Sequence, residues 1–195
     1  MTAWTLAASV LVAGAAYLVL TGYLSTWRKY RGVRLITCPE NARPAAVSVN
    51  ALRAAHWRAV AGEPVVNLKS CSRWPEMQGC DEACLSQIEA SPQSCLVRTI
   101  VADWYTGKAC VFCHKPIGRI VWHERPPAIR VSDGAIHEWT GVRVEDLPDL
   151  FRSADPVCWS CYVVEGFRHD HDDFVVERHR IEETMHTIAP SSAVY

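Results

Sequence analysis

The apolar positions of the chain are concentrated at its N-terminal end. Residues 3–24 are almost entirely apolar, and no charged side chain occurs between residues 2 and 27. At about 1.5 Å per helical residue, this stretch is long enough to cross a hydrocarbon core of about 30 Å. Trp4 stands near one end and Tyr23 and Trp27 near the other, where aromatic side chains commonly meet a membrane interface. The pattern predicts one transmembrane helix.

A cleaved secretory signal is the main alternative for this stretch. Such a signal has a positively charged start, a shorter apolar segment and a cleavage site of small residues. The first 27 residues carry no basic side chain, and the apolar run is longer than a signal needs. We therefore expect a membrane anchor.

The charges that flank the apolar stretch predict its orientation. Arg28, Lys29, Arg31 and Arg34 follow the stretch closely, and nothing basic precedes it. The positive-inside rule then predicts a single-pass protein with its N-terminus outside and its C-terminal domain in the cytoplasm. Because cytoplasmic thiols are kept reduced, paired cysteines there favour metal binding or redox chemistry over disulfides.

Beyond the anchor, short alternating segments and helical spacings are mixed, which predicts an α+β fold. Strands are expected at residues 32–36, 65–68, 118–124, 128–131 and 135–139. Helices are expected at residues 48–61, with Ser48 as the N-cap, at 81–90, 96–104 and 144–153, and from about 156 to 168.

We divide the chain into five parts: a transmembrane anchor (1–27), a basic juxtamembrane segment (28–37), a cysteine-rich helical region (38–107), a knuckle, hairpin and helix unit (108–170) and a polar C-terminal tail (171–195).

Composition raises the question of why the chain holds so many cysteines. About 160 of the 195 residues remain beyond the anchor, enough for one domain with a core of its own. Nine cysteines exceed what packing requires and indicate chemistry. The net charge of −1 gives no electrostatic case for binding nucleic acid.

Two C-x-x-C pairs carry the strongest chemical signal. Cys110 and Cys113 form one pair, Cys158 and Cys161 form the other, and 44 residues lie between them. Four thiolates complete a tetrahedral zinc site, and the two-residue spacing lets both sulfurs of a pair reach one ion. The sequence therefore predicts a zinc site at these four residues.

The order of the parts around the pairs resembles the treble-clef or zinc-ribbon type of zinc-binding unit. A knuckle at the first pair is followed by a predicted hairpin and then by a helix that begins at the second pair, over residues 109–169. This resemblance implies a structural metal site, and it does not imply a particular activity. The positive end of the helix would favour the thiolate forms of Cys158 and Cys161.

Two other interpretations of the first pair stay open. Cys110, Cys113 and His114 match the C-x-x-C-H pattern of c-type haem attachment, although Cys161 of the second pair is followed by Tyr162 instead of histidine. Either pair could also be a redox dithiol, but no thioredoxin-like βαβ pattern surrounds them.

A second group of cysteines has no recognised spacing. It comprises Cys71, Cys80, Cys84 and Cys95, and Cys38 could replace one of them. A second zinc ion is favoured over an iron–sulfur cluster, because the spacing matches no ferredoxin pattern. Disulfides are the alternative if the domain faces outward, and small core residues are another. Cys80 and Cys84 are expected on one face of a helix.

The sequence contains no nucleophile motif, no phosphate-binding glycine loop and no H-E-x-x-H pattern. We therefore expect no catalytic residues, and a membrane-anchored adaptor or accessory subunit whose partner is another membrane-associated protein. The alternative function is a membrane-anchored electron carrier that uses haem at the first pair or an iron–sulfur cluster at the second group.

Overall fold

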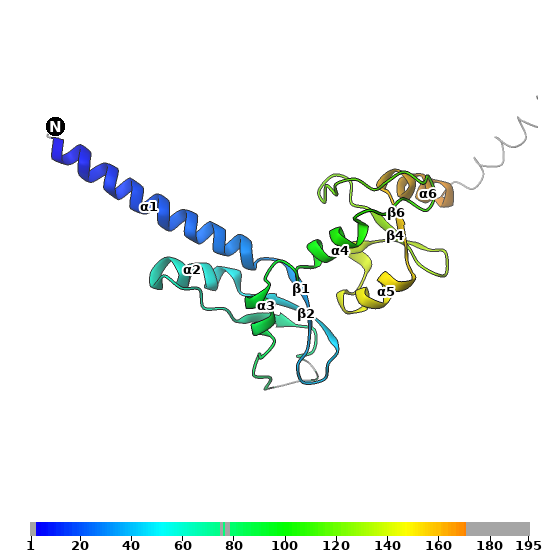
Figure 1. Ribbon diagram of the computed structural model, residues 1–195, viewed down its shortest axis with the longest axis horizontal. Coiled ribbons are helices and arrows are strands. Elements are labelled where there is room, and N and C mark those ends of the chain that lie inside the picture. Colours follow the sequence, from blue (N-terminus) through cyan, green and yellow to red (C-terminus); the bar gives the residue numbers. More distant parts are fainter. Residues whose placement is uncertain (1–2, 75, 77–78, 171–195) are drawn as a thin grey trace, which may run out of the picture. The chain divides into compact units, whose positions relative to one another are not determined.

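The computed structural model describes residues 3–74, 76 and 79–170 (Figure 1). The predicted C-terminal tail, 171–195, lies outside the described residues. The chain forms two units. The first runs up to Trp104 and also includes Val142–Arg152; the second comprises Tyr105–Gly141 and the chain from Ser153 onward. The five-part division made from the sequence remains a prediction.

The N-terminal segment forms one long helix, α1, at Ala3–Tyr30. An 18-residue window within Trp4–Tyr30 has a mean hydropathy of 1.8, and residues 4–20 are exposed on every side. At about 1.5 Å per residue the helix is about 42 Å long. It is therefore long and apolar enough to cross a membrane, as predicted.

The C-terminal turns of α1 belong to the first unit. They lie beside helix α2, Ala51–Ala61, where Ala54 and Ala55 are fully buried and allow a close approach of the two helices (Figure 1). Tyr30 is buried in the core of this unit, and Trp27 packs against the same core. Trp27, which the sequence places at the membrane interface, thus contacts the folded unit.

Helix α2 starts later than the sequence predicts. Ser48 is part of a strand, so the expected N-cap is wrong. Asn50 is the N-cap, and its side-chain oxygen accepts a hydrogen bond of 3.1 Å from the backbone N–H of Arg53. Asparagine satisfies the otherwise unpaired N–H groups of a first turn as well as serine does.

The first unit contains an antiparallel sheet in the order β1-β2-β3. The strands are β1 (Val33–Thr37), β2 (Pro44–Val49) and β3 (Leu68–Cys71). Alternate residues of β2 are buried, which is typical of a sheet with one face on a core. The third strand begins where the predicted one (65–68) was to end.

Short helices complete the first unit. They are α3 (Leu85–Ala90), most of α4 (Val97–Tyr105), the 3-10 turn η2 (Val144–Asp146) and α5 (Leu147–Ser153).

The predicted helix at 81–90 begins only at Leu85. Glu82 has a φ of +57°, which a right-handed helix cannot contain. The expectation that Cys80 and Cys84 share a helix face is therefore wrong.

The second unit has a sheet in the order β5-β4-β6, with all pairs antiparallel. Its elements are β4 (Ala128–Arg130), β5 (Ile136–Glu138), the 3-10 turn η1 (Trp139–Gly141), β6 (Asp155–Val157) and α6 (Trp159–Asp170).

The strand predicted at 118–124 is absent from these described residues. The backbone N–H groups of Glu124 and Arg125 both donate to the carbonyl of Val121, so the chain turns there.

One of the four basic residues used to predict the orientation is buried. Arg34 has 0% of its surface exposed, and its guanidinium donates to the carbonyls of Lys29, Tyr30 and Gly32 at 2.6, 2.7 and 3.1 Å. It therefore caps the C-terminal end of α1, where unpaired carbonyls favour a positive charge. Three exposed basic residues, Arg28, Lys29 and Arg31, remain beside the apolar stretch.

Candidate metal centre

The four cysteines of the C-x-x-C pairs come from two segments of the second unit that are far apart in sequence. Cys110 and Cys113 lie in a tight turn that is closed by an isolated bridge between Ala109 and Pro116. Cys158 directly follows β6, and Cys161 lies in the first turn of α6. Because β6 pairs with β4 and the turn contacts β6, the two pairs are brought to one place.

The sulfur atoms of this group lie close enough together to hold one metal ion. All four lie within 4.8 Å of one another, and the Sγ atoms of Cys113 and Cys158 are 3.8 Å apart. For a zinc–sulfur bond of about 2.3 Å, the edge of a regular tetrahedron is about 3.8 Å. The residues Cys110, Cys113, Cys158 and Cys161 can therefore hold one metal ion, as the sequence predicts.

Backbone hydrogen bonds shape the first pair. The N–H of Cys110 donates to the carbonyl of Lys115, and the N–H of His114 donates to the carbonyl of Cys110, both at 2.9 Å. His114 adopts a φ of +56°, which reverses the chain just after Cys113. The N–H of Val111 donates to the carbonyl of Pro156 at 2.9 Å and joins this turn to β6. These hydrogen bonds shape the turn and position it beside β6.

The electrostatic environment differs among the four thiols. Burial alone would raise the pKa of Cys110, but backbone N–H groups of Cys113, Cys158 and Phe112 point at its sulfur and together lower the pKa to about 6. The N–H of Cys158 lies 3.3 Å from that sulfur. Burial and the neighbouring sulfurs raise the pKa of Cys161. The thiolate form is therefore more accessible at Cys110 than at Cys161.

A charged pair supports the turn from outside. The Nε and Nη2 atoms of Arg130, on β4, donate to the Oδ2 atom of Asp155, on β6, at 3.2 and 2.6 Å. The same guanidinium stacks over the ring of Phe112, at 5.3 Å from its centroid. Arg130 thus connects the residue between the first two cysteines to the strand that leads to the second pair. No spacing or motif in the sequence indicates these three residues.

The apolar cluster around the site is small. Cys110, Ala128 and Val157 are its fully buried members, and partly buried residues that include Phe112 and Tyr162 pack against them. A small unit with few buried residues gains little from hydrophobic burial, and a bound metal commonly supplies the missing stability.

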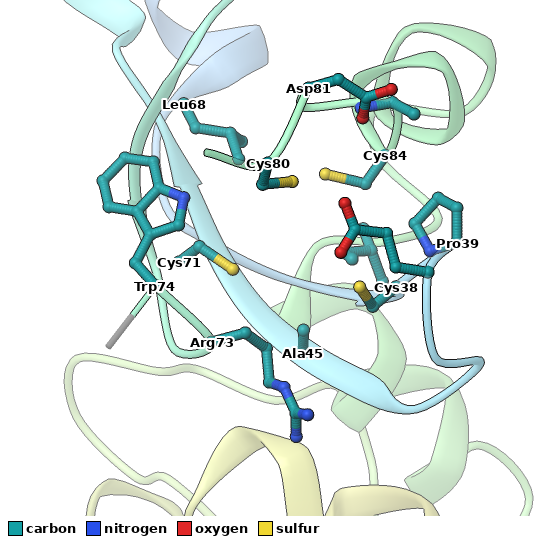
Figure 2. Close-up of a pocket in the computed structure, with 13 residues that line it drawn as sticks. Cys38, Pro39, Ala45, Leu68, Cys71, Arg73, Trp74, Cys80, Asp81 and Cys84 are labelled. Atoms are coloured by element: carbon teal, nitrogen blue, oxygen red, sulfur yellow. The ribbon is translucent and has the colours of Figure 1, made fainter. Parts of the chain in front are cut away.

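The second group of cysteines lies in the first unit, and the structure separates its members. Cys38, Cys71, Cys80 and Cys84 line one cavity, and their sulfur atoms point into it (Figure 2). Cys38 thus takes the place that the sequence-based grouping gave to Cys95.

Cys95 makes contacts of its own, away from the residues that line this cavity. Its Sγ atom donates to the carbonyls of Ser91 and Pro92, at 3.4 and 3.7 Å. Burial raises the pKa of Cys95, while the nearby guanidinium of Arg34 acts in the opposite direction. A thiol that donates its proton to carbonyls is not arranged as a metal ligand.

No protein-family model, curated protein or solved structure matches this chain, so its function has to be argued from the sites themselves.

Proposed function

We propose that this protein is a membrane-anchored, non-catalytic adaptor or accessory subunit of a membrane complex, whose cytoplasmic second unit is stabilised by zinc. The observation that carries the proposal is the closed set of four thiols at Cys110, Cys113, Cys158 and Cys161. Structural zinc sites have four protein ligands, whereas catalytic zinc sites keep one position open for water or substrate.

The architecture around the thiols supports a treble-clef-like unit. The turn with the first pair comes first along the chain, the β4–β5 hairpin follows, and the second pair stands at the start of α6. In such units the helix N-terminus faces the metal and favours thiolate ligands. The metal would then join the turn to the helix, and its loss would leave the small apolar cluster without support.

The distances between the sulfur atoms favour zinc over haem at this site. A c-type haem forms thioether bonds with both cysteines of its motif, so their sulfurs have to face the porphyrin edge. Here the sulfur of Cys113 lies 3.8 Å from that of Cys158, in the second pair. The four thiols thus lie close enough together to share one ion.

Helix α1 supports the membrane part of the proposal. Residues 4–20 of this helix are exposed and mostly apolar, and a lipid bilayer would cover them. The exposed basic residues Arg28, Lys29 and Arg31 at its C-terminal end favour the cytoplasmic side for both units. A second membrane-associated protein is then the partner that the anchor brings within reach.

The test combines metal analysis with an absorption spectrum of the full chain purified in detergent. We expect zinc at Cys110 and its three partners, no visible absorption, and the loss of one zinc ion per chain in Cys158→Ser. Cys95→Ser, the matched control, should keep all its zinc. A Soret band or a broad iron–sulfur absorption would instead identify an electron carrier and refute the adaptor proposal.

The accessory role has a separate readout in native membranes. Solubilised gently, the wild-type chain should migrate as part of a larger complex, and Cys158→Ser should be released from it. Migration of the wild-type protein as a monomer under the same conditions would argue against a subunit role.

A further inference from the structure

The cavity between the sheet and the segment before α3 has the features of a second metal site. We propose that Cys38, Cys71, Cys80 and Cys84 bind one zinc ion, separate from the ion at the C-x-x-C pairs. The proposal concerns the first unit and does not depend on the proposed function.

The sheet register places two of these cysteines on one face. Ile36 of β1 is opposite Ala45 of β2, so Cys38, two residues after Ile36, continues the same face. Cys71 is opposite Val47, which stands two residues from Ala45. Directly opposite residues of antiparallel strands project to the same side, so Cys38 and Cys71 share the buried face of the sheet.

The other two cysteines are brought over this face by hydrogen bonds. The backbone N–H of Leu68, at the start of β3, donates to a carboxylate oxygen of Glu82 at 3.1 Å. The side-chain amide of Gln87 exchanges two hydrogen bonds with the backbone of Thr37, at 3.2 and 2.7 Å. These bonds connect the segment that contains Cys80 and Cys84 to β3 and to the residue before Cys38. Four thiols from distant parts of the chain thereby line one cavity (Figure 2).

The space between the four thiols is the strongest argument against a purely structural role. Cysteine is often a small core residue, but protein cores are close-packed. The cavity that the four thiols line instead leaves about 20 Å³, room for one water-sized object. Its other lining residues are both apolar, such as Ile36, Ala45 and Leu68, and charged, namely Glu40, Arg73 and Asp81. Four sulfur ligands around such a space suit a thiophilic ion.

The charges around the cavity also favour a cation. Glu40 and Asp81 place carboxylate oxygens within 4.8 Å of the sulfur of Cys80. Arg73 also lines the cavity, and it is paired with Glu76 at 3.1 Å. The backbone N–H of Glu82 donates to the sulfur of Cys80 at 3.4 Å, a contact that stabilises a thiolate. When zinc binds, each ligand thiol releases its proton to solvent, and no electron is transferred.

The first experiment counts zinc in the full chain purified in detergent. We expect two zinc ions per chain in the wild type and in Cys95→Ser, and one in Cys84→Ser. Cys158→Ser should also keep one ion, held by the second site. One ion in the wild type, with none left in Cys158→Ser, would overturn this inference and leave the proposed function standing. If zinc is lost from Cys84→Ser but not from Cys158→Ser, this inference stands and the proposed function is refuted.

The second experiment needs no variant and so does not depend on whether Cys84→Ser folds. The wild-type chain is alkylated before and after chelation, and each cysteine is located by mass spectrometry. Cys38, Cys71, Cys80 and Cys84 should become reactive only after chelation, whereas the reactivity of Cys95 should not change. A disulfide among these four, equal reactivity before chelation, or iron with acid-labile sulfide would each refute a zinc site.

Discussion

At the scale of single residues, neighbours in sequence take different roles in the fold. Arg31 and Arg34 belong to one basic cluster in the sequence, yet Arg31 is exposed and Arg34 is fully buried at the end of α1. Burial lowers the pKa of Arg34, and three carbonyl oxygens compensate the buried charge. The charge of a residue is visible in the sequence, but its environment is set by residues that pack around it.

The support of the first metal site by Arg130 leads to a prediction at this scale. Arg130→Met should weaken zinc binding by several-fold, because the substitution removes the hydrogen bonds to Asp155 and the stacking on Phe112. Zinc affinity is measured by competition with a chromogenic chelator.

Arg152→Met is the matched control for Arg130→Met. Arg152 forms an exposed pair with Asp149 that is within one helix of the first unit. Exposed pairs of this kind contribute about 0–1 kcal/mol. Equal zinc affinity in the two variants would show that Arg130 does not support the site.

At the scale of elements, the sequence located the helices and the strands β1, β4 and β5, whereas it missed β2 and β6 and predicted a strand at 118–124 that is absent there. Other errors fall at the ends of elements. The apolar spacing of residues 48–61 predicts a helix, but β2 extends to Val49 and the helix begins after Asn50. Likewise, the left-handed backbone of Glu82 delays α3 to Leu85. The periodicity of apolar residues indicates the middle of a helix or strand. The ends depend on which backbone N–H and C=O groups find hydrogen-bond partners.

The junction between α1 and β1 gives a prediction at this scale. Gly32 has a φ of +99°, and a Cβ atom there would lie 2.9 Å from the Cδ1 atom of Leu96. Gly32→Ala should lower the free energy of unfolding by about 1–2 kcal/mol for the left-handed backbone, and by more for the displaced Leu96. Urea unfolding followed by tryptophan fluorescence measures this loss.

Gly62→Ala separates the two contributions. Gly62 is also left-handed, with a φ of +83°, but nothing lies within 4 Å of the position that a Cβ atom would take. Gly62→Ala should therefore lower the free energy of unfolding by less than Gly32→Ala does. If Gly62→Ala is as destabilising, the contact with Leu96 contributes nothing measurable.

At the scale of the whole molecule, each unit contains one group of four cysteines. In the second unit the group is built from two local pairs, and in the first it is assembled from two strand ends and a connecting segment. The end of α1 packs into the first unit, so the apolar helix continues directly into folded protein. A membrane anchor of this kind would hold the first unit close to the bilayer surface.

The orientation of the chain is the prediction that belongs to this scale. A reporter that is active only in the cytoplasm, fused after Tyr195, should be active, because exposed basic residues flank α1 on its C-terminal side. Replacing Arg28, Lys29 and Arg31 with glutamate should reduce this activity. Replacing Arg143 and Arg152, which are exposed and far from α1 in sequence, with glutamate should leave the reporter activity unchanged.

Activity of a reporter that works only outside the cytoplasm would reverse the predicted orientation. The cysteines would then lie in an oxidising compartment, where disulfides become favourable.

The sequence alone determined the apolar helix and the two C-x-x-C pairs. Both are local signals: a helix long enough for a bilayer needs only its own residues, and two-residue spacing brings two thiols together within one turn. Only the tertiary structure decided that Cys38 joins Cys71, Cys80 and Cys84, and that Cys95 does not. Strand register and long-range hydrogen bonds make that choice, and these depend on contacts between residues that are far apart in the chain.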